Sequence, residues 1–262
     1  MRFDGAIFDV DGVLVDSPHE AAWRTALQRL MEGHWRDIAP QTSYAPERFS
    51  TAVYQEFVAG KPREAGARAA LEFFGIPDPD GQRVREYSDT KQVMILELIE
   101  QSRFTAFEDA LRLLLRLRAA GLRLGVASSS KNANAFLQRV PVGAFLERGG
   151  ASAVPVGPPV PLGATLLDMF DANTCGRNFA RGKPDPEIFL TCAAELGLPP
   201  ARCLVIEDAV SGVQAARAGG MAAIGIARLG DEALLHQAGA NLVVTSLDQI
   251  DITELLENGG QP

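Results

Sequence analysis

An apolar run that ends in two aspartates is the most constraining feature of this sequence. Residues 3–8 predict a short buried strand, and Asp9 and Asp11 follow it before the turn residue Gly12. Side chains at i and i+2 of an extended chain point to the same side, so both carboxylates are expected at one place. Buried carboxylates are costly without a compensating cation, and oxygen ligands of this kind suit Mg²⁺. Taken alone, the motif also fits an ordinary acidic turn.

Further segments repeat the pattern of an apolar run followed by polar residues. Residues 122–127 are followed by SSSKN, and residues 203–206 are followed by Glu207 and Asp208. Lys183, in the sequence GKPDP, precedes a helical pattern over residues 187–196. Apolar runs at 221–226 and 241–244 predict two more short strands. Strands that alternate with helical patterns predict an α/β fold with a doubly wound parallel sheet and a site at the strands' carboxyl ends.

Each polar residue also has a purely structural interpretation. Ser128 is a residue type that commonly caps the N-terminus of a helix. Lys183 could be a solvated loop lysine. Glu207 and Asp208 could lie at the positive end of a helix that begins near Val210. These alternatives stay open for each residue taken singly.

Four motifs stand in an order that resembles one protein family over nearly the whole chain. DVDGVLVDS, SSSKN, GKPDP and IEDAVSG resemble the haloacid dehalogenase superfamily, and specifically its beta-phosphoglucomutase-like branch. The resemblance implies a Rossmann-like doubly wound parallel sheet core with an inserted all-helical cap domain. It also implies a Mg²⁺-dependent enzyme that transfers a phosphoryl group.

The chemistry of such a reaction assigns a role to each candidate catalytic residue. The Asp9 carboxylate can attack phosphorus and form an aspartyl-phosphate. Asp11 would protonate the leaving oxygen and then remove a proton from the incoming water or hydroxyl. Ser128 can donate a hydrogen bond to a phosphoryl oxygen, and Lys183 supplies positive charge beside Asp9.

The metal ligands are implied by the resemblance. Asp208 would complete a Mg²⁺ site together with Asp9 and the backbone carbonyl of Asp11. Glu207 would lie beside this site and orient waters or ligands.

A segment of different character, residues 18–102, separates the first two core segments. Apolar residues recur in it at helical spacing, with no strong strand run between them, over residues 21–31, 49–57, 67–74 and 93–99. We expect this segment to be the cap domain, with a core formed by residues 1–17 and 103–262. Hinges are expected near Asp16–Pro18 and Arg103–Phe107.

Substrate choice is expected to depend on residues of the cap. The resemblance places Arg63 where relatives bind a distal phosphate, Lys91 where a cap lysine reaches the active site, and His19 near a cap-hinge histidine. The guanidinium fork suits phosphate oxygens. Ordinary surface or helix roles remain open for all three. From the core, the substrate-binding candidates are Ser129, Ser130, Lys131 and Asn132.

The connection from Gly143 to Asn178 is longer than is usual in the family and rich in proline and glycine. Its portion Val154–Pro161 contains too many prolines to be a central strand. We expect a loop or small flap there, followed by a short strand near Met169–Asp171. The sequence leaves open whether this connection lies beside the active-site entrance or far from the site.

The composition limits the partners that can be expected. Acidic residues outnumber basic ones 33 to 25, for a net charge of −8, which argues against nucleic acid as a partner. No apolar run of membrane-spanning length and no signal-peptide pattern is present, so we expect no membrane partner and a cytoplasmic location. Cys175, Cys192 and Cys203 lack metal-ligand spacing, and the last two lie in apolar contexts typical of buried thiols.

Three functions are compatible with the sequence. The favoured one is a Mg²⁺-dependent phosphatase that hydrolyses a small phosphorylated metabolite, most simply a sugar phosphate. The second is a mutase of the beta-phosphoglucomutase kind, which the phosphate-binding candidates Ser128–Asn132 and Arg63 also suit. The third is a catalytically silent binding or regulatory protein, which would require a broken motif, and none is visible. The oligomeric state is left open.

Overall fold

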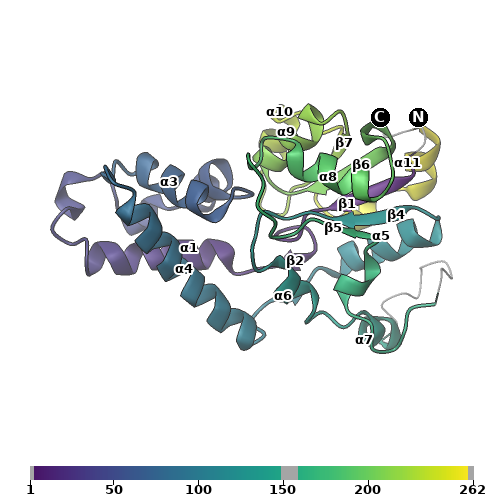
Figure 1. Ribbon diagram of the computed structural model, residues 1–262, viewed down its shortest axis with the longest axis horizontal. Coiled ribbons are helices and arrows are strands. Elements are labelled where there is room, and N and C mark those ends of the chain that lie inside the picture. Colours follow the sequence, from purple (N-terminus) through teal and green to yellow (C-terminus); the bar gives the residue numbers. More distant parts are fainter. Residues whose placement is uncertain (1–2, 149–158, 259–262) are drawn as a thin grey trace. The chain divides into compact units, whose positions relative to one another are not determined.

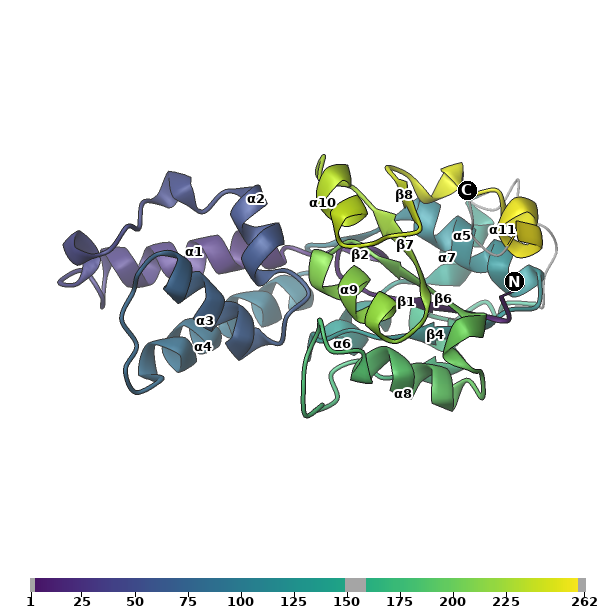
Figure 2. The same ribbon diagram turned by 90° about the horizontal axis from the view of Figure 1, so that it is seen from above.

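Two compact units make up the structure, a computed structural model that describes residues 3–148 and 159–258. The first unit contains residues 1–16 and 105–262, and the second contains residues 17–104. The first is an α/β core, and the second is entirely helical within the part of the chain that is described (Figures 1 and 2).

The core is built on a six-stranded sheet in which all neighbouring strands are parallel. From edge to edge the order is β5-β4-β1-β6-β7-β8. Because the chain builds outward from β1 first on one side and then on the other, the strand order reverses beside β1. This doubly wound arrangement is the one expected from the alternating strand and helix patterns. The strands are β1 (Gly5–Phe8), β4 (Arg123–Val126), β5 (Ala172–Asn173), β6 (Cys203–Glu207), β7 (Ala222–Ile226) and β8 (Leu242–Val244).

Helices cover both faces of this sheet. In Figure 1, α8 (Glu187–Glu195), α9 (Val210–Ala218) and α10 (Glu232–Gln237) lie on one face, and α5 (Glu108–Ala119) lies on the other. The first group packs its apolar side chains against those of β1, β6 and β7 in one cluster. Gly125 in β4 allows α8 to approach closely, because a Cβ there would lie 2.5 Å from Cys192 Sγ. The remaining core helices are α6 (Ala133–Leu137), α7 (Val142–Glu147) and α11 (Ile252–Asn258).

The strands expected from the apolar runs are confirmed, with one error of position. Met169 ends a 3₁₀ turn, η4 (Leu166–Met169), and the edge strand is β5, which begins after Asp171. Asp168 accepts hydrogen bonds from the backbone N–H and the hydroxyl of Thr165, and this reciprocal cap curls the chain into a turn. Most of the expected flap at Val154–Pro161 lies outside the described residues.

The helical unit has a hydrophobic core of its own. Trp23, Leu27, Leu71, Phe74 and Tyr87 are buried together, and the rings of Trp23 and Tyr87 meet edge to face at 4.9 Å. Its main helices are α1 (His19–Glu32), α3 (Arg63–Phe73) and α4 (Gln82–Glu100). The helix expected over residues 49–57 is interrupted, with α2 (Thr51–Val53) followed by a π-helical turn, η3 (Tyr54–Val58).

A two-stranded antiparallel ribbon lies where the chain leaves the core and returns to it. In this ribbon β2 (Val15–Asp16) pairs with β3 (Thr105–Ala106). The hinges expected near these positions remain a prediction. Over residues 3–148 and 159–258, no helix is both long enough and apolar enough to cross a membrane. Cys175, Cys192 and Cys203 are free and buried.

Asp109, in the first turn of α5, joins this helix to the turn formed by residues 246–249. Its carboxylate accepts hydrogen bonds from Leu247 N at 2.9 Å, Ser246 Oγ at 3.2 Å and Arg228 Nη2 at 3.0 Å. Burial raises the pKa of Asp109, but the bonds from Arg228 and Leu247 outweigh it and hold the pKa below its usual value. The ionised carboxylate therefore stabilises the fold.

We predict that Asp109→Asn lowers the free energy of unfolding at pH 7 by about 2 kcal/mol, because charge-assisted hydrogen bonds are lost. A carboxyl group with a lowered folded pKa stabilises the fold above its unfolded pKa of about 3.9, and this contribution disappears as the pH falls through the folded pKa. The difference in free energy of unfolding between the wild type and Asp109→Asn should therefore become smaller in acid. Denaturant unfolding from pH 7 to 3 measures it. Asp248→Asn, which breaks a more exposed pair in the same turn, should cost less than about 1 kcal/mol. A difference that is independent of pH would contradict this account.

Candidate active site

The carboxyl ends of β1, β4 and β6 place the candidate catalytic residues side by side. Phe8 is in register with Val126 and with Ile206, so Asp9, Ala127 and Glu207 follow at the same level of the sheet. Two backbone bonds fix this level: Asp9 N donates to Ile206 O at 3.0 Å, and Ala127 N donates to Phe8 O at 2.9 Å. The sheet register therefore brings three distant sequence segments to one edge.

Lys183 connects two of these strand ends. Its Nζ donates to Asp9 Oδ1 at 2.6 Å and to Glu207 Oε1 at 2.5 Å, and its side chain is fully buried. The ammonium also lies 4.8 Å from the centroid of the Phe189 ring in α8. Burial lowers the pKa of Lys183, but Asp9 and Glu207 outweigh this effect and raise the pKa above its usual value. Lys183 is thus a fixed positive charge and not a solvated loop lysine.

Glu207 connects Lys183 to the start of α9, and its expected role of orienting waters or ligands beside the metal site remains a prediction. It is fully buried at the end of β6, and its Oε2 accepts hydrogen bonds from Asp208 N and Ala209 N, both at 3.1 Å. Its other oxygen holds Lys183, so the carboxylate links this lysine to the start of α9. A Cβ on Gly212 would lie 1.9 Å from Glu207 Oε1, so glycine is needed for this close packing.

The donor set fits a hard divalent cation. Asp9, Glu207 and Asp208 each offer a carboxylate oxygen, and these oxygens lie within 4.8 Å of one another. Burial raises the pKa of Asp9 to about 7, Lys183 opposes this shift, and Glu207 and Asp11 add to it. Desolvation also raises the pKa of Asp208 well above its usual value, and neighbouring carboxylates raise it further. Lys183 alone therefore leaves negative charge that a cation such as Mg²⁺ would compensate.

Asp11 lies in a tight loop that follows Asp9. Gly12 has a positive φ of 80°, and a Cβ on it would lie 1.9 Å from Asp208 Oδ2. The absent side chain lets the backbone after Asp11 approach the candidate metal ligand Asp208. The Asp11 carboxylate is half-buried and acts electrostatically on both Asp9 and Asp208. The structure thus brings Asp9, Asp11, Lys183, Glu207 and Asp208 into one site.

The SSSKN segment follows β4. Ser128 is buried, and its Oγ accepts from Ser130 N at 3.1 Å, so it closes a turn ahead of α6 and does not cap that helix. Ser129 and Ser130 are half-buried, and Asn132 is buried as the residue before α6. Lys131 Nζ donates to Gly176 O and to Asn178 Oδ1, both at 2.6 Å, which ties this segment to the loop after β5. Phosphate binding by these residues remains a prediction.

The other substrate-binding candidates belong to the helical unit. Lys91 Nζ lies 2.9 Å from His19 Nδ1, both side chains are buried, and the ammonium is 5.0 Å from the Trp23 ring centroid. Arg63 is the first residue of α3 and is partly exposed. Their roles toward a substrate remain predictions.

Sequence reasoning missed Arg228, which approaches the loop after Asp11 from the end of β7. Its Nε donates to Gly12 O at 2.9 Å. Its position two residues past a parallel strand was the available signal, since the carboxyl ends of such strands surround the site.

Comparison with known proteins identifies the family. Residues 3–220 match the model of the haloacid dehalogenase-like hydrolase family. The chain is 32% identical to a beta-phosphoglucomutase of Mycobacterium tuberculosis, over 93% of this chain and 90% of that protein. It is 29% identical to hexitol phosphatase A of Escherichia coli, over 97% and 96% of the two chains. The chain therefore belongs to the haloacid dehalogenase-like hydrolase family.

A solved structure supports the same fold. The beta-phosphoglucomutase of a hyperthermophilic Pyrococcus strain superimposes with a TM-score of 0.68 at 25% identity, covering 98% of each chain. The core with an inserted helical cap, expected from the sequence, is thereby confirmed.

We predict that Gly212→Ala lowers the free energy of unfolding by about 1–3 kcal/mol, because the new methyl group displaces Glu207 and loosens its bond to Lys183. Denaturant unfolding measures the change. Gly163→Ala is the control, since no atom of residues 3–148 and 159–258, apart from its two chain neighbours, was found within 4 Å of its Cβ position. Equal stability of the two variants would contradict the packing that we describe around Glu207.

Proposed function

We propose that this protein is a Mg²⁺-dependent phosphatase that hydrolyses a small phosphorylated metabolite, a sugar phosphate, through an aspartyl-phosphate on Asp9. One observation carries the proposal: a buried aspartate at the end of β1 lies 2.6 Å from a buried lysine and beside two further carboxylates. A nucleophile, a fixed positive charge and cation ligands are what phosphoryl transfer to a carboxylate needs.

In the first step the Asp9 carboxylate attacks phosphorus, and the bond from phosphorus to the leaving oxygen breaks. Protonated Asp11 gives its proton to that oxygen, so the alcohol leaves neutral. In the second step Asp11 removes a proton from water, whose oxygen attacks the same phosphorus and releases inorganic phosphate. Asp9 returns as a carboxylate and Asp11 as an acid, so atoms and protons balance.

Lys183 keeps Asp9 ready for attack. Burial favours the protonated form of Asp9, whose pKa is raised to about 7, and a protonated carboxyl group is a poor nucleophile. The adjacent ammonium favours the ionised form and remains beside the phosphoryl group as negative charge develops. Mg²⁺, held by Asp9, Asp208 and the Asp11 carbonyl, would add positive charge toward the phosphoryl oxygens.

The substrate class is supported by the names of the relatives, a phosphoglucomutase and a hexitol phosphatase. We assign binding of the sugar phosphate to Arg63, Lys91 and His19 of the helical cap and to the core residues Ser128–Asn132. Guanidinium and hydroxyl groups are suitable donors to phosphate oxygens.

A mutase of the beta-phosphoglucomutase kind is the second candidate, favoured by the 32% identity to such an enzyme. Both reactions use the same aspartyl-phosphate, and they differ in whether water or a sugar hydroxyl attacks it. A catalytically silent protein is the least supported alternative, because each candidate catalytic residue is present in the core.

The first test is incubation with beta-glucose 1-phosphate, Mg²⁺ and a trace of beta-glucose 1,6-bisphosphate, followed by a panel of other sugar phosphates. We expect release of inorganic phosphate from at least one substrate, without accumulation of glucose 6-phosphate. Asp9→Asn should lower turnover by at least about 1,000-fold, whereas Asp16→Asn, on the exposed end of β2, should be active. Glucose 6-phosphate without free phosphate would establish the mutase instead.

The metal requirement has a separate test. We predict that a chelator abolishes turnover, that Mg²⁺ restores it, and that Asp208→Asn raises the Kd for Mg²⁺ by at least about 10-fold. Titration calorimetry with the substrate-free protein measures this Kd, with Asp16→Asn as control. Unchanged Mg²⁺ affinity in Asp208→Asn would exclude Asp208 as a ligand.

A further inference from the structure

Arg228 and Asp109 form a largely buried ion pair that has no assigned role in the proposed reaction. Two guanidinium nitrogens donate to the carboxylate, Nη2 to Oδ1 at 3.0 Å and Nη1 to Oδ2 at 3.2 Å. The side chains are 15% and 10% exposed, and the guanidinium lies 3.6 Å from the centroid of the Phe107 ring. This combination of fork geometry and ring stacking is specific to arginine.

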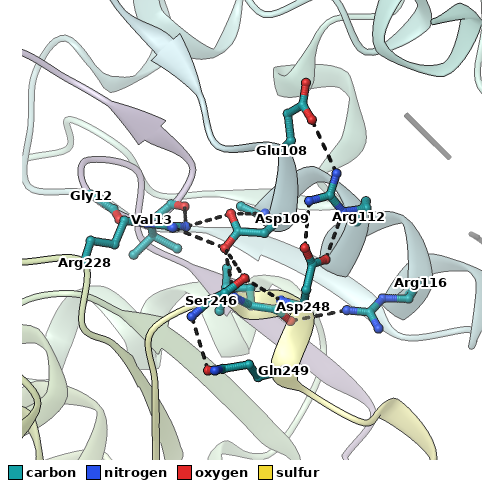
Figure 3. A network of polar contacts seen from close by, with 12 residues as sticks. Gly12, Val13, Glu108, Asp109, Arg112, Arg116, Arg228, Ser246, Asp248 and Gln249 are labelled. Carbon is teal, nitrogen blue, oxygen red and sulfur yellow. Dashed lines mark hydrogen bonds and ion pairs between the residues drawn. The ribbon is translucent and has the colours of Figure 1, made fainter. Parts of the chain in front are cut away.

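The same guanidinium also binds the loop that contains Asp11. Nε donates to Gly12 O at 2.9 Å, and Nη2 donates to Val13 O at 3.3 Å. Figure 3 shows Arg228 between these two carbonyl groups on one side and Asp109 on the other. Arg228 thus fixes the two residues that directly follow Asp11.

Asp109 is itself held firmly in place. Beyond Arg228, it accepts hydrogen bonds from Ala110 N at 2.8 Å and from Leu247 N at 2.9 Å. It also accepts one from Ser246 Oγ at 3.2 Å (Figure 3). The start of α5 and the turn at 246–249 therefore set the orientation of the carboxylate, and the carboxylate sets that of the guanidinium.

A displacement of Gly12 would also move residues of the proposed metal site. The loop is closed by its own backbone bonds, Gly12 N to Val15 O and Leu14 N to Val10 O, both at 2.9 Å. It therefore tends to move as one piece, together with Asp11. On its other side Gly12 packs so closely against Asp208 Oδ2 that a Cβ would lie 1.9 Å from it. Gly12 is thus bound between Arg228 and a candidate Mg²⁺ ligand.

A neighbouring ion pair provides an internal comparison. Arg112 of α5 binds Asp248 through Nε at 2.9 Å and Nη2 at 2.7 Å, so it joins the same helix to the same turn (Figure 3). Within the described part of the chain, its side-chain hydrogen bonds reach Asp248 and Glu108 but not the loop after Asp11. If both arginines only joined α5 to this turn, replacing either one would lower the free energy of unfolding, and the folded protein would keep its kcat and Mg²⁺ affinity.

We propose that Arg228, oriented by Asp109, is a positioning residue that fixes the Gly12 and Val13 carbonyls and thereby places Asp11 and Asp208 for Mg²⁺ binding and phosphoryl transfer. This inference rests on the proposed function. Arg228 acts through the backbone of the loop and does not touch the reacting atoms.

The test compares Arg228→Lys with Arg112→Lys in the intact protein. Lysine keeps the charge but cannot bind the carboxylate and both carbonyls through one planar fork. For Arg228→Lys we expect kcat to fall about 10–100-fold with KM within about 2-fold, and the Kd for Mg²⁺ to rise about 10-fold. For Arg112→Lys we expect kcat, KM and the Mg²⁺ Kd of the wild type. Steady-state kinetics and calorimetry without substrate measure these values.

Equal Mg²⁺ affinity and kcat in Arg228→Lys and wild type would overturn the proposal, as would equal losses in both arginine variants. Asp109→Asn is the second variant, which keeps Arg228 but removes the charge that orients it, and it should change kcat and Mg²⁺ affinity in the same direction. If Arg228→Lys does not fold, the kcat and Mg²⁺ affinity of Asp109→Asn test the proposal. A wild type that hydrolyses no sugar phosphate would overturn the proposed function, and the Mg²⁺ titrations would still decide the role of Arg228.

Discussion

A fully buried ammonium group, Lys183 Nζ, lies between a carboxylate at the end of β1 and another at the end of β6. Removing it would leave Asp9 and Glu207 buried without a counterion, which is among the most destabilising changes a core can undergo. The same contact ties the loop before α8 to the centre of the sheet. Fold and proposed chemistry therefore depend on one charge, because the lysine that supports the structure also favours the ionised form of Asp9, the proposed nucleophile.

The charges of the site do not balance within the core. Asp9, Asp11, Glu207 and Asp208 act on one another electrostatically, and Lys183 offsets only part of their charge. Such a site is more stable with a bound cation, and cation binding should be coupled to folding stability by mass action. Gly12 and Gly212 make this crowding possible, because any side chain at either position would displace a carboxylate. The carboxylates that repel one another, Glu207 and Asp208, are also the ones packed closely against these two glycines.

The sequence predicted the strands, their order of appearance and the residues at their carboxyl ends, because apolar runs ending in charged residues are local patterns. It did not predict that Glu207 holds Lys183, since this contact joins residues 24 positions apart through the register of the sheet. The misplaced strand near Met169 reflects a cap between Thr165 and Asp168 that competes with strand formation. The position of Arg228 two residues past β7 indicates the edge of the sheet, but its partners could not be predicted, because Gly12 and Val13 bind it through backbone carbonyl groups, which every residue has.

The ribbon of β2 and β3 has a consequence for how such a protein can change. Because Val15–Asp16 and Thr105–Ala106 are paired, both ends of the inserted helical unit start from neighbouring strands. An insertion with adjacent ends can be lengthened, replaced or diversified without altering the register of the sheet that carries it. The helical unit also packs its own core around Trp23 and Phe74. The helical unit can therefore change as a separate module, while Asp9 and Glu207 keep their places at the ends of the strands and Lys183 keeps its place between them.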